Sequence, residues 1–140
     1  MATVSTEGLE ELIGDMGKIA EIPDDTILEM LSAQAEVVAD AQKKKAQALG
    51  VFDTGKTKES ITFKKKLKIR KDSKAIYVYP QGTRKDGNER QVAEVAFINE
   101  YGKHGQPARP FINTANEESA DAANEAAMKV YDDFLKSKNL

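Results

Sequence analysis

One stretch of the sequence matches a motif that binds phosphate groups in many enzymes. Residues 50–57, Gly-Val-Phe-Asp-Thr-Gly-Lys-Thr, fit the P-loop pattern G-x-x-x-x-G-K-[ST] at every specified position. A working P-loop leaves a buried strand and opens a helix of a parallel sheet. Here residues 24–49 have a helical pattern, and no apolar strand ending in an acidic magnesium ligand follows. The sequence therefore predicts that the match is accidental and that the chain binds no nucleotide.

The remaining composition leaves little material for other chemistry. The chain has no cysteine and a single histidine, His104. Disulfides and thiolate metal sites are excluded, and a histidine-based metal site or a Ser-His-Asp triad is hard to assemble. We expect His104 to be a loop residue. The predicted protein has no cofactor, no metal and no catalytic residue, and is not an enzyme.

Length and hydropathy place the chain among globular proteins. Its 140 residues are 40% hydrophobic and 31% charged, which predicts a single domain over residues 1–140. The apolar runs are far shorter than the roughly 20 residues that span a bilayer, and the N-terminus lacks a signal-peptide pattern. We expect a protein made in a bacterial cytoplasm without membrane contact.

Charge is strongly segregated along the chain. Residues 1–42 carry ten acidic side chains and one lysine, a net charge of −9. Residues 56–90 carry twelve basic and four acidic side chains, a net charge of +8. Such asymmetry favours a molecule whose two ends meet different partners, or whose copies dock acidic end against basic strip. The alternative is that the charges solvate two unrelated surfaces.

Helical patterns open and close the sequence. Apolar residues at helical spacing predict a short helix over residues 6–20 and a longer one over 24–49, with Asp24 and Asp25 at its N-cap. Its apolar face is expected to contain Ile27, Leu31, Ala35, Val38, Ala41 and Leu49. A terminal helix is predicted from Pro110, with a stripe formed by Phe111, Ala115, Ala122, Ala126, Val130 and Phe134.

Between the helices the apolar period changes to two. In residues 61–70 apolar side chains alternate with Lys64, Lys66, Lys68 and Arg70, which predicts a strand with one buried and one cationic face. Residues 76–79 and 92–98 are predicted as further strands, with a mobile hairpin loop over 80–90. The predicted fold class is α+β: two N-terminal helices, a three-stranded antiparallel sheet, and a long C-terminal helix packed on the sheet.

Two groups of residues resemble a known family. Asp53-Thr54-Gly55 followed by Ser60-Ile61 is similar to a D-T-G-x-L-x-x-S-I signature, although Thr57 replaces the leucine. Glu100-Tyr101-Gly102, at the end of the predicted third strand, and then Ala108-Arg109-Pro110-Phe111 form a more specific pair. In order and spacing these residues resemble the HK97 gp10-like phage proteins over roughly residues 7–135.

The resemblance implies a structural protein of the phage particle. It implies a head-tail joining or tail-completion subunit, assembled in the host cytoplasm into a ring at the neck or tail end of the virion. Implied partners are further copies of the chain, as a hexamer or alternatively a dodecamer, and the neighbouring connector, head-completion and tail-tube proteins. Non-specific contact with double-stranded DNA in the channel is also implied.

Several residues are candidates for these roles. We expect assembly contacts at Glu100, Tyr101 and Arg109, and in the loop at Arg84, Lys85 and Arg90. The guanidinium of Arg109 can pair with a carboxylate such as Glu100, within one chain or between ring neighbours. The other motif positions have structural explanations: turn residues Asp53, Thr54, Gly55 and Ser60, positive φ at Gly102, a helix start at Pro110, and a core anchor at Phe111.

The sequence is also compatible with a second function. The cationic strand with Lys64, Lys66, Lys68 and Arg70, near Tyr77 and Tyr79, is also typical of a nucleic-acid-binding module. Against that alternative, the sequence pI is about 5.5 and aromatic residues make up only 6%.

Overall fold

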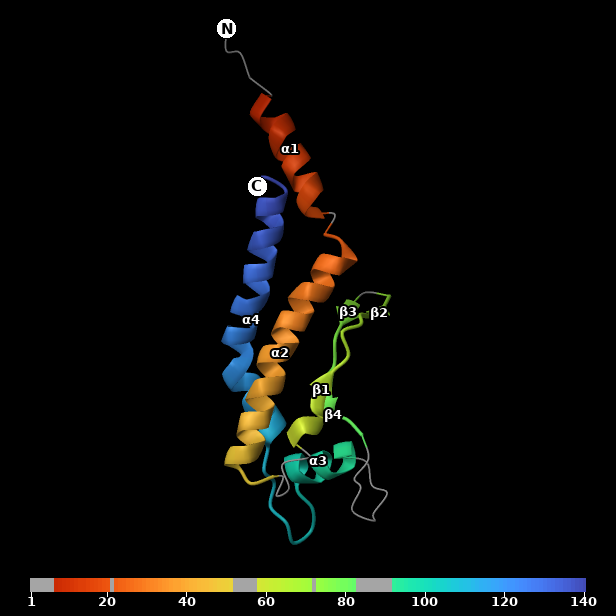
Figure 1. Ribbon diagram of the computed structural model, residues 1–140, viewed down its shortest axis with the longest axis vertical. Coiled ribbons are helices and arrows are strands. Elements are labelled where there is room, and N and C mark those ends of the chain that lie inside the picture. Colours follow the sequence, from red (N-terminus) through yellow and green to blue (C-terminus); the bar gives the residue numbers. More distant parts are fainter. Residues whose placement is uncertain (1–6, 21, 52–57, 72, 83–91) are drawn as a thin grey trace.

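The computed structural model describes residues 7–20, 22–51, 58–71, 73–82 and 92–140. Helices, short strands and a long C-terminal helix give it the α+β class predicted from the sequence. Figure 1 shows three layers side by side: helix α4, helix α2 and an extended β-hairpin, with α3 across one end and α1 projecting from the other. The C-terminus lies at the end of the molecule from which α1 projects.

The two N-terminal helices form where the apolar spacing predicts them. Helix α1 covers Glu7–Ala20 and α2 covers Asp24–Ala48. The expected N-cap is wrong in detail: Pro23 occupies the cap position, and Asp24 and Asp25 lie in the first turn, where their charge favours the helix dipole. At the other end Gly50 has a φ of 64°, a conformation that glycine adopts without strain.

Helix α4, Phe111–Ser137, packs along α2 rather than on the sheet as predicted. The helices are antiparallel, because Gln34 bonds Asn124 while Gln42 bonds Asn116. Small side chains fill most of the seam, so the helices approach closely. On α2 the buried residues are Ser32, Ala35, Ala39, Gln42 and Ala46, and on α4 they are Phe111, Ala115, Ser119, Ala123, Ala127 and Phe134.

The buried stripe of α4 therefore differs from the predicted one in its middle. Ser119, Ala123 and Ala127 are buried, whereas the predicted Ala122 is exposed and Ala126 and Val130 are half-buried. The choice among alanines on a helix with many of them cannot be made from hydrophobicity alone, because the partner helix decides which row faces inward. Two serines and Gln42 in the seam gave no apolar signal at all.

The strand region is one long hairpin in two parts instead of a continuous strand. Strand β1, Ile61–Phe63, pairs antiparallel with β4, Val78–Pro80, and β2, Lys68–Arg70, pairs with β3, Ser73–Ala75. Four residues, 64–67, separate the strands on one limb, and two residues, 76–77, separate them on the other. The longer limb must bend there, as at a β-bulge. Arg70 at the end of β2 is paired with Ser73 at the start of β3, so the chain reverses direction between these two strands.

The predicted third strand is wrong, because residues 92–101 form a helix. Helix α3 covers Val92–Tyr101 and buries Val92, Ala96, Asn99 and Glu100. Ala96, Asn99 and Glu100 follow Val92 by four, seven and eight residues, which is the spacing of one helix face. A short apolar run of this length is compatible with either structure, and the valines and aromatics of this run favoured a strand. The sheet therefore has no third strand in the described part of the chain.

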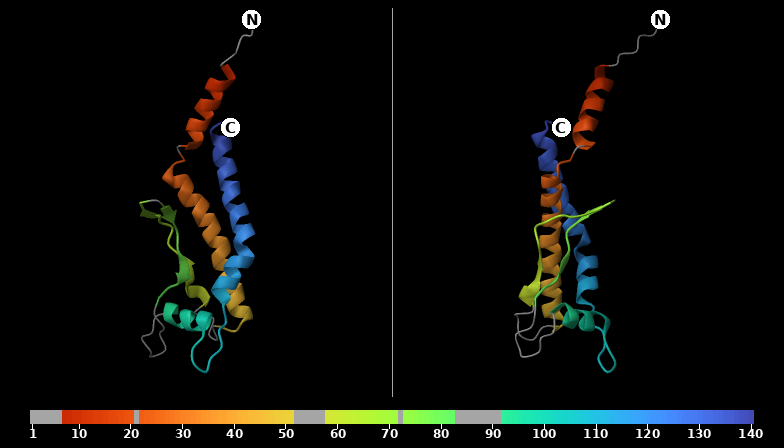
Figure 2. Two further views of the ribbon diagram at one scale, coloured as in Figure 1. Left: turned by 180° about the vertical axis from the view of Figure 1, so that it is seen from behind. Right: turned by 90° about the vertical axis from the view of Figure 1, so that its right-hand side faces the viewer.

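The core is concentrated where α2, β1, α3 and α4 meet, at the end of the molecule away from α1 (Figure 2). Phe111 and Ile61 are fully buried there, beside Val51, Ala46 and Ala96. The prediction that Phe111 anchors the core is confirmed. This cluster fixes the ends of four elements and positions the corner between α3 and α4.

Candidate functional site

The corner between α3 and α4 contains a buried carboxylate that binds the start of the terminal helix. Glu100, in the last turn of α3, is 8% exposed. Its two carboxylate oxygens accept hydrogen bonds from the backbone N–H groups of Ile112 and Asn113, each at 2.8 Å. The first amides of a helix have no partner within it and lie at the positive end of its dipole. Glu100 thus caps α4 from a neighbouring helix.

Arg109 joins the same corner to the end of α2. Its guanidinium Nη1 donates to the carbonyl oxygen of Gly50 at 3.0 Å, and its backbone N–H donates to the carbonyl of Asn99 at 2.6 Å. The residue is otherwise exposed. Within the chain Arg109 therefore has an acceptor other than the predicted Glu100, whose oxygens bind the amides of α4. A contact of Arg109 with a neighbouring copy stays a prediction.

Gly102 allows the chain to leave α3 and turn toward α4. Its φ is 77°, as predicted for this position, and its N–H donates to the carbonyl of Ile98 at 2.8 Å. A Cβ added here would lie 2.9 Å from the backbone nitrogen of Ala108 and 2.9 Å from the carbonyl oxygen of Gln106. Both the backbone conformation and the space require glycine. The loop that contains the exposed His104 then reaches Pro110, which occupies the N-cap position of α4.

Two exposed aromatic rings lie on the outer face of α3 beside this corner. Phe97 is 63% exposed and Tyr101 is 70% exposed, and their ring centroids are 4.7 Å apart. Residues four apart on a helix share a face, so the rings form one apolar patch. Tyr101 was predicted as an assembly residue, whereas Phe97 was not recognised because it was assigned to a strand. Helical spacing between the two aromatics was the signal that could have identified it.

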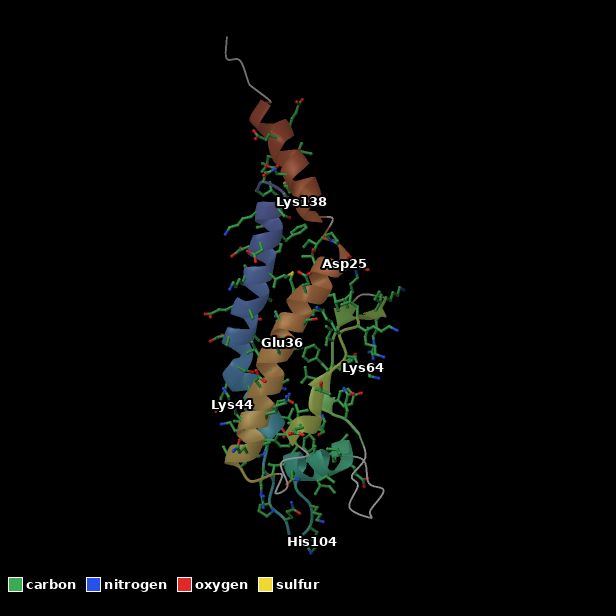
Figure 3. All side chains as sticks on the ribbon, viewed as in Figure 1. Asp25, Glu36, Lys44, Lys64, His104 and Lys138 are labelled. Atoms are coloured by element: carbon green, nitrogen blue, oxygen red, sulfur yellow. The ribbon has the colours of Figure 1, made fainter. Side chains whose placement is uncertain are left out.

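The cationic hairpin projects from the opposite side of the molecule from α4. Figure 3 shows Lys64 on that side. The four predicted DNA-facing residues, Lys64, Lys66, Lys68 and Arg70, are all exposed. Three further lysines of the hairpin are exposed as well: Lys65, Lys71 and Lys74. Ile69 is 64% exposed rather than buried as predicted, because the tip of the hairpin extends past the core. Lys74 forms an ion pair with Asp24 at the start of α2.

Comparisons with protein-family models, with curated proteins and with solved structures find no match. The resemblance to the HK97 gp10-like proteins therefore depends on the motif residues and on the contacts those residues make.

Some predicted site residues lie outside the described part of the chain. They are the turn residues Asp53, Thr54 and Gly55, and the loop cations Arg84, Lys85 and Arg90. Most of the P-loop match, residues 52–57, lies outside it too. The residues just before the match belong to helix α2, not to a strand, as the sequence predicts. Ser60 ends a short 3-10 helix, Lys58–Ser60, and its carbonyl accepts a bond from the N–H of Gln81 at 2.9 Å.

No group of three or more histidine, cysteine, aspartate or glutamate side chains among the described residues could hold a metal ion. None of the described helices is long and apolar enough to cross a membrane. Three surfaces of the described residues carry clustered exposed groups: the Phe97–Tyr101 pair of α3, the cationic hairpin, and α1 with its exposed Leu9, Leu12, Ile13 and Met16.

Proposed function

We propose that the chain is a structural subunit of a tailed-phage particle, acting at the head-tail junction or tail end as one copy of a ring. The observation that carries the proposal is the joining of the two motif segments at one corner. Glu100, from the E-Y-G segment, binds the backbone just after A-R-P-F, and Arg109, from A-R-P-F, binds the end of α2. The residue types shared with the family thus have linked physical roles here.

The corner also offers a surface suited to a partner protein. Phe97 and Tyr101 are exposed side by side, and aromatic residues are enriched at protein interfaces. Glu100, Gly102 and Arg109 hold the helix that carries these rings in a fixed position. We infer that this aromatic pair contacts a neighbouring connector or tail protein, with Arg109 at the edge of the contact.

Deletion of the gene from an inducible prophage tests the proposal. We expect DNA-filled heads and separate tails by electron microscopy, with infectivity restored by the wild-type gene on a plasmid. Complementation by Phe97→Ala/Tyr101→Ala should fail although the purified variant melts near the wild-type temperature. Met128→Ala, which removes another apolar side chain that is 52% exposed, is the matched control and should complement. A deletion strain that yields normal infectious particles would refute the proposal.

A second candidate function is supported by the hairpin. Seven exposed basic side chains lie near Tyr77 and Tyr79, which are 45% and 46% exposed, and bases can stack on such rings. Anisotropy with labelled duplex and single-stranded DNA tests this candidate at several salt concentrations. Loss of binding in Lys64→Gln/Lys66→Gln/Lys68→Gln/Arg70→Gln, but not in Lys129→Gln/Lys136→Gln, would support it. Equal binding by both variants, or no binding at low salt, would argue against it.

A further inference from the structure

Helix α1 presents an apolar stripe that its own chain leaves exposed. Leu9, Leu12, Ile13 and Met16 lie at the spacing of one helix face, and each is 55–60% exposed. Figure 1 shows α1 extending beyond the body of the molecule, away from the hairpin. Four large apolar side chains in one exposed row mark an interaction surface.

The charges beside this stripe restrict what can cover it. Residues 7–20 contain Glu7, Glu10, Glu11 and Asp15 against Lys18, so the helix has a net charge of −3. Two copies of α1 would repel each other, and an anionic membrane surface would repel it as well. The partner that fits is a basic surface with some apolar area.

The hairpin of this chain has those properties. Residues 64–74 contain seven basic side chains and one acidic one, a net charge of +6, and Ile69 is 64% exposed at their centre. The aliphatic stems of lysines add apolar area that can cover leucine and methionine side chains while their charges reach the carboxylates. Among the described surfaces, the hairpin carries the largest group of exposed basic side chains.

The two surfaces lie on different sides of the molecule. In Figure 1 α1 inclines toward the α4 side, and the hairpin lies on the other side of α2. A contact between two different surfaces is heterologous and repeats from copy to copy, closing into a ring if the rotation allows. We infer that α1 of one copy docks on the β2–β3 hairpin of the next copy. The inference deepens the proposed function, since it specifies the contact from which the ring would form.

Disulfide trapping tests the contact in the purified full-length chain, which has no cysteine of its own. Gly17→Cys is placed beside the apolar stripe of α1, where an added Cβ meets nothing within 4 Å. Ser73→Cys is placed on the exposed hairpin, and Ala120→Cys on the exposed face of α4 is the control. Each variant carries one cysteine, so every disulfide joins two chains.

We expect the Gly17→Cys and Ser73→Cys pair to form the mixed dimer roughly tenfold faster than the Gly17→Cys and Ala120→Cys pair, because docked thiols are held at high effective concentration. High salt should reduce the difference, since Glu10, Glu11 and the basic side chains of the hairpin are exposed. Equal rates for the two pairs would overturn the inference. Faster formation of Gly17→Cys homodimers would also overturn it, by pointing to pairing of α1 with α1.

Charge exchange gives a second readout. Glu10→Lys/Glu11→Lys in the α1 partner should slow trapping to the control rate, and Lys66→Glu/Lys68→Glu in the hairpin partner should restore it. Glu29→Lys/Glu36→Lys, the same change of charge at exposed positions of α2, should leave trapping fast. The contact would be contradicted if the α1 variant and the α2 control variant both slowed trapping. It would also be contradicted if neither of these two variants slowed it.

These results are separable from the virion assay. If trapping fails while the deletion strain still accumulates separate heads and tails, the proposed function stands and the docking contact is wrong. If trapping succeeds and the deletion strain is fully infectious, the copies associate as inferred but the proposed virion role is wrong. Loss of DNA binding in Lys66→Glu/Lys68→Glu without loss of trapping would assign the hairpin to nucleic acid and overturn the docking contact.

Discussion

Replacement of Glu100 by glutamine is the most direct test of whether its carboxylate caps helix α4. The carboxylate accepts two backbone hydrogen bonds of 2.8 Å at the start of α4 while it is 8% exposed. An amide of the same shape has one oxygen to accept with, and its NH₂ group would face the other backbone N–H. The variant therefore loses one charge-assisted bond and the favourable interaction of the charge with the helix dipole.

The expected loss of stability follows from the kind of hydrogen bond that is removed. A hydrogen bond to a charged group contributes about 1.5–3 kcal/mol, so Glu100→Gln should lower the free energy of unfolding by about 2 kcal/mol. In a chain of this size that corresponds to a melting temperature lower by about 6–8 °C. Glu100→Ala leaves both amides without their acceptor, and we expect a loss of about 3–5 kcal/mol.

Urea unfolding followed by circular dichroism, together with thermal melting, measures both losses. Glu94→Gln is the matched control, because Glu94 is exposed on the same helix and its neutralisation should change stability little. A Glu100→Gln variant that melts within about 2 °C of the wild type would refute the capping role. In that case the corner would be held by its apolar contacts alone.

Further predictions concern the same region and the P-loop match. Phe111→Ala should cost about 3–5 kcal/mol in urea unfolding, because the ring is 0% exposed, and a small loss would contradict its place in the core. Gly102→Ala should yield a misfolded or strongly destabilised chain by circular dichroism, since the added methyl meets backbone atoms; a native melting curve would contradict this. Arg109→Ala should cost about 1 kcal/mol through the lost bond to Gly50, so a loss of several kcal/mol would exclude a mainly intermolecular role. Millimolar ATP with magnesium should leave the melting temperature unchanged, and a rise of several degrees would revive the nucleotide site at residues 50–57.

The parts of the fold that the sequence predicts are those with local signals. Helix α2 follows Pro23, begins with two aspartates and ends before Gly50, and α4 begins directly after Pro110. Both ends of α2 and the start of α4 lie within one residue of the predicted positions. The positive φ of Gly102 is likewise a local feature. Capping and turn chemistry depend on a few adjacent residues, so a single sequence is enough to find them.

The parts that were missed depend on contacts between distant segments. Residues 92–98 have valine, phenylalanine and isoleucine at a density typical of a strand, but they are helical because Val92, Ala96 and Asn99 face the core together. The acceptor of Arg109 is Gly50, 59 residues away, and the amides bound by Glu100 belong to another helix. No local pattern specifies such partners, and the expected pairing of Arg109 with Glu100 is replaced by these two separate contacts.

The uneven distribution of large buried side chains has a consequence for how the molecule opens. Phe111 and Ile61 hold the end beside α3, whereas the α2–α4 seam farther along is lined mainly by alanine and serine, which bury little apolar area. Local opening costs least where least apolar surface is exposed. Amide exchange should therefore be slow beside Phe111 and progressively faster toward the two chain ends. The end beside α3 is therefore the rigid part of the molecule, and the far ends of α2 and α4 are the part that can adjust to a neighbouring protein.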